Sequence, residues 1–199
     1  MKLIETLRKI KKNNKSIKIK DFIKIIGKEA FNVDGKFKCW FREHLQSNLD
    51  KNSMNRQLAI QQIRKKLRAN KSSIGTWMQI PHASIAEIMG QAGYDWVAVD
   101  MEHGSISHAQ LPDLFRALEL GETLPLVRLV EGTTKECKQA LDAGAGGVII
   151  PMVESAKQLE KVRSACSWPP TGIRGVGYSR ANLFGRHFQS YSDEAQSPL

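Results

Sequence analysis

Apolar and polar positions form a repeating pattern from residue 73 onward. Four short apolar segments predict strands, at residues 74–80, 96–100, 124–129 and 147–151. A segment with helical apolar spacing follows each strand, at residues 84–92, 108–120, 134–143 and 156–165. Glycines just after the first three helices supply stop signals, at Gly93, Gly121 and Gly144. Strands that alternate with helices in this way are typical of right-handed βαβ units in a parallel sheet.

This repeat predicts an α/β fold made of the first four βα units of a (β/α)8 TIM barrel. Units of roughly 25 residues suit such a barrel, for which about 250 residues is typical. No GxGxxG or Walker motif follows any strand, so dinucleotide-binding and P-loop folds lose support. A separate amphipathic helix is predicted at residues 55–67, ahead of the first strand.

Charge divides the chain into two parts. Residues 1–71 hold 20 of the Lys and Arg and 6 of the Asp and Glu, a balance of +14, whereas residues 72–199 hold 10 and 14, a balance of −4. We therefore expect a basic, Lys-rich and partly helical extension at residues 1–53 and a barrel-like domain at residues 54–199. The extension is interpreted as a solvated leader, as a nucleic-acid or acidic-surface patch, or as an addition ahead of a natural start at Met54. No nucleic-acid motif accompanies the charge, which favours the leader and predicts no nucleic-acid partner.

Cysteine usage and hydropathy point to a soluble, cytoplasmic protein. Cys39, Cys137 and Cys166 lie far apart without CxxC spacing, which argues against a disulfide framework or a zinc site. No apolar run approaches the roughly 20 residues of a membrane span, and the N-terminus lacks the apolar core of a secretory signal. No membrane partner is expected.

Polar residues gather where the predicted strands end, which is where βα barrels place their chemistry. The first strand supplies Trp77 and Gln79, the second is followed by His103, and the third ends in Arg128. His103 is a candidate general base, since imidazole titrates near neutral pH, or alternatively a loop residue that caps a helix. Arg128 interrupts an apolar strand, so it either holds a carboxylate or enolate oxygen or forms a salt bridge within the site.

Further polar residues allow several interpretations. Asp100 and Glu102 follow the second strand and are predicted either to bind a hard cation or to pair with Arg128. Asp142, late in the third helix, has the position of a surface or capping residue. The glycine-rich segment at residues 169–185 carries Arg174 and Arg180, which predicts either an anion-binding loop or a structural loop.

Five ordered motifs resemble the HpcH/HpaI class II aldolase and citrate lyase family. They are "WVAVDMEH", "LVRL", "ALDAGA", "VIIPMV" and "PPTGIRGVG" followed by "RANLFG". The resemblance covers residues 54–199 and is strongest to 2-keto-3-deoxy sugar acid and 4-hydroxy-2-oxoheptanedioate aldolases. It implies a (β/α)8 barrel that cleaves a 4-hydroxy-2-oxoacid to pyruvate and an aldehyde, in a homo-oligomer, through an enolate on a divalent metal such as Mg, Mn or Co.

The resemblance also assigns roles to residues. His103 is expected to be the general base, Asp142 to orient it, and Arg128 to stabilise the enolate, with Asp100 and Glu102 in supporting roles. Apart from the resemblance, the position of Trp77 at the end of the first strand makes it a candidate substrate-binding residue. The metal-binding Glu and Asp of the family follow the fifth and sixth strands, and the fifth strand is expected to begin at residues 197–199. The metal ligands are therefore expected beyond residue 199, so the first half of a barrel is expected here and the chain is predicted to be inactive alone. Alternatives are a non-catalytic remnant with a binding role for the basic N-terminus, and a half-barrel subunit that needs a second chain.

Overall fold

The structure, a computed structural model, describes residues 55–196 and 198–199. The predictions for residues 1–53 therefore lie outside the described residues. The elements follow one another in the order α4 (Arg56–Arg68), β1 (Gly75–Met78), α5 (Ala83–Gly90), β2 (Trp96–Asp100), α6 (Leu111–Leu120), β3 (Leu124–Arg128), α7 (Thr134–Ala143), β4 (Gly147–Ile149), α8 (Ala156–Cys166), η1 (Arg180–Gly185) and α9 (Phe188–Ala195).

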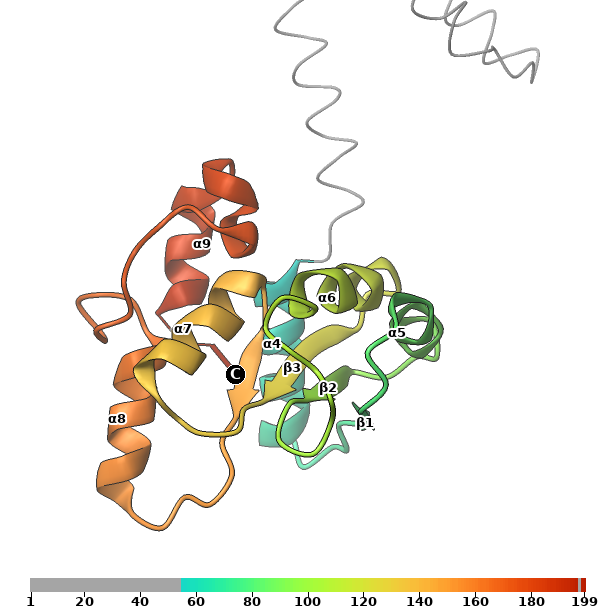
Figure 1. Ribbon diagram of the computed structural model, residues 1–199, viewed down its shortest axis with the longest axis horizontal. Coiled ribbons are helices and arrows are strands. Elements are labelled where there is room, and N and C mark those ends of the chain that lie inside the picture. Colours follow the sequence, from blue (N-terminus) through green and yellow to red (C-terminus); the bar gives the residue numbers. More distant parts are fainter. Residues whose placement is uncertain (1–54, 197) are drawn as a thin grey trace, which may run out of the picture. The chain divides into compact units, whose positions relative to one another are not determined.

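The four strands form one parallel sheet in the order β1-β2-β3-β4 (Figure 1). Each strand pairs with the next one along the chain, as successive βα units of a barrel do. Local signals set the helix limits, since the side chains of Asn55 and Thr133 cap α4 and α7. Gly144 ends α7 in the left-handed region, at φ 108°, where glycine avoids steric strain. The predicted α/β fold is confirmed.

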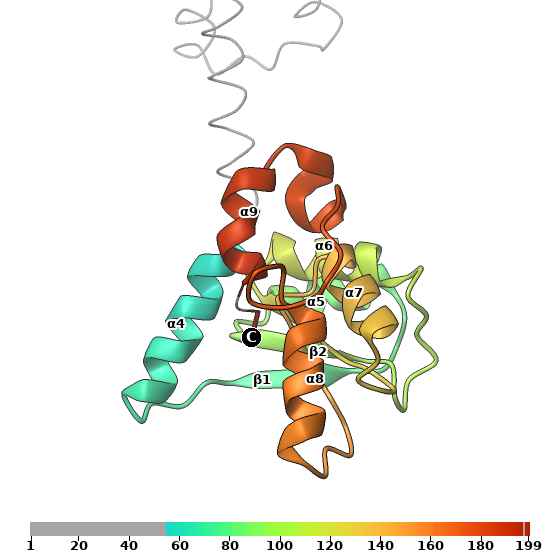
Figure 2. The same cartoon turned by 90° about the vertical axis from the view of Figure 1, so that its left-hand side faces the viewer.

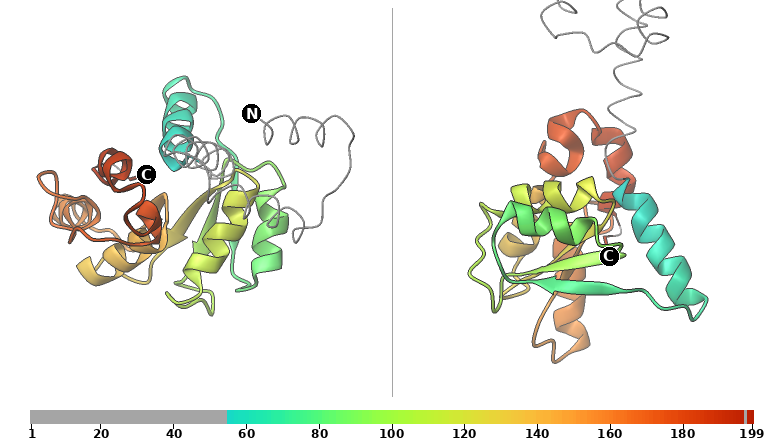
Figure 3. Two further views of the ribbon diagram at one scale, coloured as in Figure 1. Left: turned by 90° about the horizontal axis from the view of Figure 1, so that it is seen from above. Right: turned by 90° about the vertical axis from the view of Figure 1, so that its right-hand side faces the viewer.

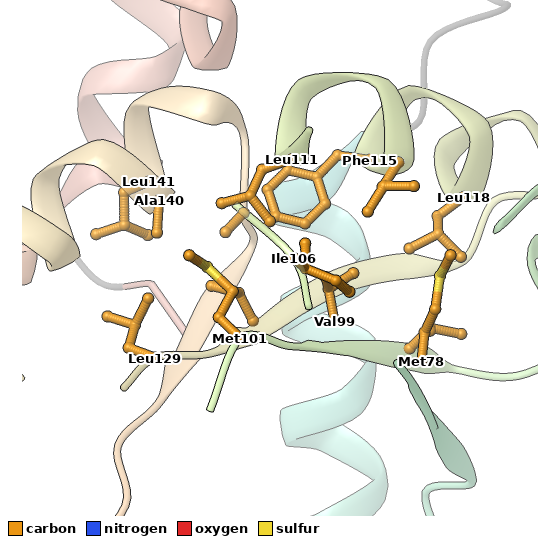
Figure 4. Close-up of a cluster of buried hydrophobic side chains, with 14 of the residues drawn as sticks. Met78, Val99, Met101, Ile106, Leu111, Phe115, Leu118, Leu129, Ala140 and Leu141 are labelled. Atoms are coloured by element: carbon orange, nitrogen blue, oxygen red, sulfur yellow. The ribbon is translucent and has the colours of Figure 1, made fainter. Parts of the chain in front are cut away.

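The outward face of the sheet is buried under α5, α6, α7 and α8. Alternate strand residues such as Val97, Val99 and Val127 point into this layer. Figure 4 shows the cluster between strands and helices, which includes Met78, Met101, Ile106, Leu111, Phe115, Leu118, Leu129, Ala140 and Leu141. This layer fixes the strands, and so it fixes the positions of the residues at their carboxyl ends.

The opposite face of the sheet, called the inner face below, is covered in part by α4. Figure 3 shows α4 on the other side of the sheet from α5 and α6. Ile60 and Ile63 of α4 are buried against Ala98, Leu124 and Leu126. The amino-terminal part of the inner face is therefore apolar and closed.

A buried arginine ties α4 to the helices at the amino-terminal end of the sheet. The Arg56 Nε donates to Glu194 of α9 at 2.9 Å, and its Nη1 donates to Glu119 of α6 at 3.2 Å. Arg180 of η1 donates to the same Glu119 at 2.6 Å. Figure 2 shows α4 and α9 meeting at this end. We call Arg56, Glu119, Arg180 and Glu194 the basal ion network.

Two features of the C-terminal part extend the predicted pattern. The glycine-rich loop ends in the irregular 3-10 segment η1, and α9 follows it, although no helix was predicted there. Leu199 lies beside β4, where its N–H donates to the Gly146 carbonyl at 3.0 Å and its carbonyl accepts from Val148 N–H at 3.1 Å. This is the bonding pattern of a further parallel strand, at the position where a fifth strand was expected.

Candidate active site

The candidate site lies on the inner face at the carboxyl ends of β1, β2 and β3. Asp100 and Arg128 end their strands and are register partners across β2 and β3. Residues two apart share a face, so both side chains point the same way as the apolar Ala98 and Leu126 below them. The inner face thus changes from apolar to charged within one strand step.

Asp100 and Arg128 form a bidentate ion pair. The Arg128 Nε and Nη2 donate to the two Asp100 carboxylate oxygens at 2.9 and 2.6 Å. Asp100 is fully buried, whereas the Arg128 side chain is 22% exposed. The hydrogen bond from Arg128 holds the pKa of the Asp100 carboxyl well below its usual range, and the same bond raises the pKa of Arg128. Both groups are therefore charged over the physiological pH range.

Other groups hold both members of this pair. The backbone N–H groups of Glu102 and His103 donate to Asp100 Oδ1 at 3.1 and 3.3 Å. The Glu102 carboxylate lies 3.2 Å from Arg128 Nε. The guanidinium carbon of Arg128 lies 4.5 Å from the centre of the Trp77 ring, a cation–π contact. The predicted pairing of Asp100 and Glu102 with Arg128 is thus present, and Trp77 contacts Arg128.

His103 lies beside this cluster in the loop after β2. Its side chain is 64% exposed, and its Nε2 lies 3.7 Å from a Glu102 carboxylate oxygen. That contact becomes an ion pair only when the imidazole is protonated. The structure therefore brings His103, Glu102 and Arg128 to one edge of the sheet and leaves the imidazole accessible.

Asp142 is not part of this cluster. It lies one residue before the end of α7, and a helix between parallel strands runs back toward their amino-terminal ends. Burial raises the pKa of its carboxyl, an effect opposed by Arg174 and Lys138. No hydrogen bond or ion pair among the described residues joins Asp142 to His103, so one chain does not bring the two together.

The arginines of the glycine-rich segment have structural contacts. Arg180 belongs to the basal ion network and also donates to the Ala143 carbonyl at 3.0 Å. Arg174 is fully buried, and its Nη2 donates to the Tyr191 hydroxyl at 3.0 Å. These contacts fit the interpretation of the segment as a structural loop.

Gln79 contacts the site, although no role was predicted for it. Its Nε2 donates to Asp100 Oδ2 at 2.8 Å. Strand alternation after β1 puts residue 79 on the face of Trp77, which is a usable signal. A polar residue at a strand end is common, however, and its partner becomes visible only when the register of β1 on β2 is known.

The described residues provide no set of side chains that could bind a divalent cation. Residues 55–196 and 198–199 contain no group of three or more His, Cys, Asp or Glu side chains placed to hold a metal ion. Both Asp100 oxygens already accept from Arg128 and other donors, and the guanidinium would repel a cation at this position.

Among the described residues, the helices are too short or too polar to span a membrane.

Comparison with known proteins decides the family. The model of the HpcH/HpaI aldolase/citrate lyase family matches residues 73–195. The chain belongs to this family. The resemblance seen in the five sequence motifs is thereby confirmed, and the candidate site lies within the matched segment.

Relatives and solved structures of this family agree with the assignment. The chain is 40% identical over 125 residues to the hydroxypyruvate/pyruvate aldolase of Roseobacter denitrificans, which covers 62% of this chain and 49% of the relative. It is 40% identical over 138 residues to the 2-keto-3-deoxy-L-rhamnonate aldolase of Escherichia coli K12, covering 68% and 51%. The chain thus spans about half the length of these relatives. A family protein from Burkholderia cenocepacia superposes with a TM-score of 0.62 at 30% identity, over 67% of this chain and 55% of that one.

Proposed function

We propose that the chain carries part of the active site of a carbon–carbon lyase that cleaves a 4-hydroxy-2-oxoacid to pyruvate and an aldehyde. One observation carries the proposal: a fixed guanidinium lies beside an accessible imidazole at the carboxyl edge of a family barrel sheet. Relatives named as aldolases for hydroxypyruvate, pyruvate and a 2-keto-3-deoxy sugar acid support this substrate class.

Arg128 supplies the positive charge of the proposed site. Its Nε and Nη2 donate to Asp100, and among the described residues no acceptor for a hydrogen bond from its Nη1 is found. Nη1 can therefore donate to the carboxylate of a 2-oxoacid or to the enolate oxygen that develops during cleavage. A guanidinium that is already oriented costs little reorganisation during the reaction.

His103 supplies the proton transfer. Its neutral imidazole takes the proton of the substrate's 4-hydroxyl, and the C3–C4 bond then breaks to give the aldehyde and the pyruvate enolate. The electron pair of the broken bond enters the enolate, whose oxygen faces Arg128. The imidazolium of His103 then gives its proton to C3 of the enolate, which completes pyruvate and restores the neutral imidazole. Glu102, 3.7 Å from His103 Nε2, stabilises the imidazolium that forms in between.

The role of Asp142 in orienting His103 stays a prediction. Since the two residues lie toward opposite ends of the sheet within one chain, their contact requires a second copy of the chain. This fits the predicted homo-oligomer. The divalent metal is also a prediction, and since the described residues do not fit it, no step above involves it. A cytoplasmic location likewise stays a prediction.

Pyruvate release tests the proposal. The full chain is incubated with a 4-hydroxy-2-oxoacid and Mg or Mn, and pyruvate is measured through lactate dehydrogenase and NADH. We expect turnover when the chain is combined with a polypeptide that supplies the remaining barrel strands, such as the carboxyl-terminal half of a relative. In that combination we expect His103→Ala to lower kcat by about 100-fold to 10,000-fold, the usual contribution of a general base.

A second histidine provides the matched control. His82 caps α5 through its Nδ1, which accepts from Ser84 N–H at 3.2 Å, and His82→Asn keeps a capping side chain. We expect this variant to retain wild-type turnover. Absence of pyruvate from the wild-type chain in that combination would overturn the proposal and favour the non-catalytic alternative. Equal loss in both variants would overturn the role of His103.

A further inference from the structure

Gln79 occupies the first position after β1, directly beside the proposed site. It lies on the same strand face as Trp77, whose ring contacts Arg128. Its side-chain Nε2 donates to Asp100 Oδ2 at 2.8 Å. A carboxylate only accepts hydrogen bonds, so it is the nitrogen of the Gln79 amide that must face Asp100.

The two oxygens of Asp100 are held unequally. Oδ1 accepts from Arg128 Nε and from the backbone N–H groups of Glu102 and His103. Oδ2 accepts from Arg128 Nη2 and from Gln79, and no further donor to it is found in residues 55–196 and 198–199. Apart from Arg128, two backbone N–H groups of the loop hold Oδ1, whereas Gln79 is the one other donor to Oδ2 among the described residues.

The backbone around Gln79 is packed closely against the loop after β2. A Cβ atom built on Gly104 would lie 2.3 Å from the Asp100 carbonyl oxygen and 3.3 Å from both the Cα and the carbonyl oxygen of Gln79. Glycine at residue 104 thus allows this loop to approach the end of β1. The close packing keeps the Gln79 amide within reach of Asp100.

We propose that Gln79 is a positioning residue, which fixes the plane of the Asp100 carboxylate and thereby the direction of the Arg128 guanidinium. The effect of Gln79 on catalysis rests on the proposed function, in which Arg128 faces the substrate. In Gln79→Leu the Asp100 carboxylate can rotate about its Cβ–Cγ bond, so the bidentate pair loosens. Arg128 keeps its charge and loses its fixed direction.

Solvent exchange of the Arg128 Nε–H tests the positioning role without any assay of activity. Its signal in a 1H–15N NMR spectrum is assigned by its loss in Arg128→Lys. We expect the wild-type proton to exchange slowly and Gln79→Leu to speed its exchange about tenfold. Loss of one hydrogen bond to a charged group lowers the free energy of opening by an amount that corresponds to about this change in rate. Gln158→Leu is the matched control.

Gln158 suits this control because it also holds a loop at the same edge of the sheet. Its Oε1 accepts from Glu154 N–H at 3.0 Å, and its Nε2 donates to the Met152 carbonyl at 3.4 Å, without contact to Asp100. We expect wild-type Arg128 exchange in Gln158→Leu. Unchanged exchange in Gln79→Leu would overturn the proposal, and so would equal acceleration in both variants, which would indicate general loosening.

Pyruvate binding connects the positioning role to the proposed function. Calorimetric titration of the full chain with pyruvate in the presence of Mg is expected to give a Kd that rises about fivefold in Gln79→Leu and stays unchanged in Gln158→Leu, in keeping with one weakened charged contact. If wild type does not bind pyruvate, the proposed function fails while the exchange measurement still decides the role of Gln79. If wild type binds and Gln79→Leu binds equally well, the positioning role is overturned.

Discussion

The inner face of the sheet has two halves built from the same strands. In the amino-terminal half, Ala98, Leu124 and Leu126 are buried under the isoleucines of α4. In the carboxyl-terminal half, Asp100 and Arg128 occupy the next positions on the same face. The first half is closed by apolar packing, and the second is held by the ion pairs of Arg128 with Asp100 and Glu102 and by hydrogen bonds to Asp100.

The contrast shows that one sheet face separates apolar packing from the charged candidate site. Apolar contacts in the first half have no direction, so they stabilise without orienting any group. Ion pairs and hydrogen bonds in the second half depend on direction, and they fix a charge where a ligand can approach. Substitutions in the two halves should therefore differ in what they change.

Removal of the Arg128 charge should have the largest effect on stability. Arg128→Leu leaves the fully buried Asp100 carboxylate without its ionic partner, which we expect to lower the free energy of unfolding by about 4 kcal/mol. Urea denaturation measures it. The control is Arg116→Leu, because Arg116 pairs with Asp113 on the surface, with side chains 55% and 71% exposed. A change within about 0.5 kcal/mol is expected there, and equal effects at both arginines would contradict the contrast.

A cavity in the apolar half should have the next largest effect. Ile63 is 4% exposed, so Ile63→Ala should lower the free energy of unfolding by about 3 kcal/mol through lost burial and a cavity. The Arg128 Nε–H exchange should stay at its wild-type rate. Ile88 of α5 is 67% exposed, and Ile88→Ala should change stability by less than about 0.5 kcal/mol. An altered Arg128 signal in Ile63→Ala would show that the halves are not separable.

Acid should weaken the polar half selectively. The pKa of Asp100 is lowered in the folded chain, so its contribution to stability is present above about pH 4, the range of an unfolded Asp, and is lost as the pH falls. Asp100→Asn should therefore cost about 2 kcal/mol at neutral pH. Unfolding curves between pH 7 and pH 2 should show the difference from wild type shrinking with acid. A constant difference would contradict the assigned cause.

Loss of the His103 imidazole should have the smallest effect on stability. Because the side chain is 64% exposed and its contact to Glu102 is long, His103→Ala should change the free energy of unfolding by less than about 0.5 kcal/mol. The same denaturation assay measures it. A loss comparable to that of Arg128→Leu would show that His103 belongs to the structural part of the site.

Much of the fold could be predicted because its signals are local. β2 and α7 have the predicted limits, since an apolar run and a helix ended by glycine are complete within a few residues. Helix α6 begins at Leu111 rather than at residue 108, because the Gln110 side chain accepts from Ser107 and forms a turn first. Helix α9 was missed because only a few of its residues, such as Tyr191 and Ala195, meet the core.

The candidate site was predictable in composition but not in geometry. Strand ends and family motifs pointed to His103 and Arg128, and alternation placed Asp100 on the face of Arg128. Which Asp100 oxygen accepts from each donor depends on the register between strands. The hydrogen bond from Gln79 to Asp100 could therefore not be predicted. The separation of Asp142 from His103 follows from the predicted βαβ topology, because a helix between parallel strands runs back toward their amino-terminal ends.

The basal ion network has a consequence for how the chain acquires its structure. Arg56 and Glu194 are 138 positions apart, whereas Asp100 and Arg128 are separated by 28. During synthesis from the N-terminus, α4 precedes its partner on α9 by almost the whole domain, whereas Asp100 and Arg128 leave the ribosome close together. The candidate site is therefore expected to assemble early, and the basal ion network to form last.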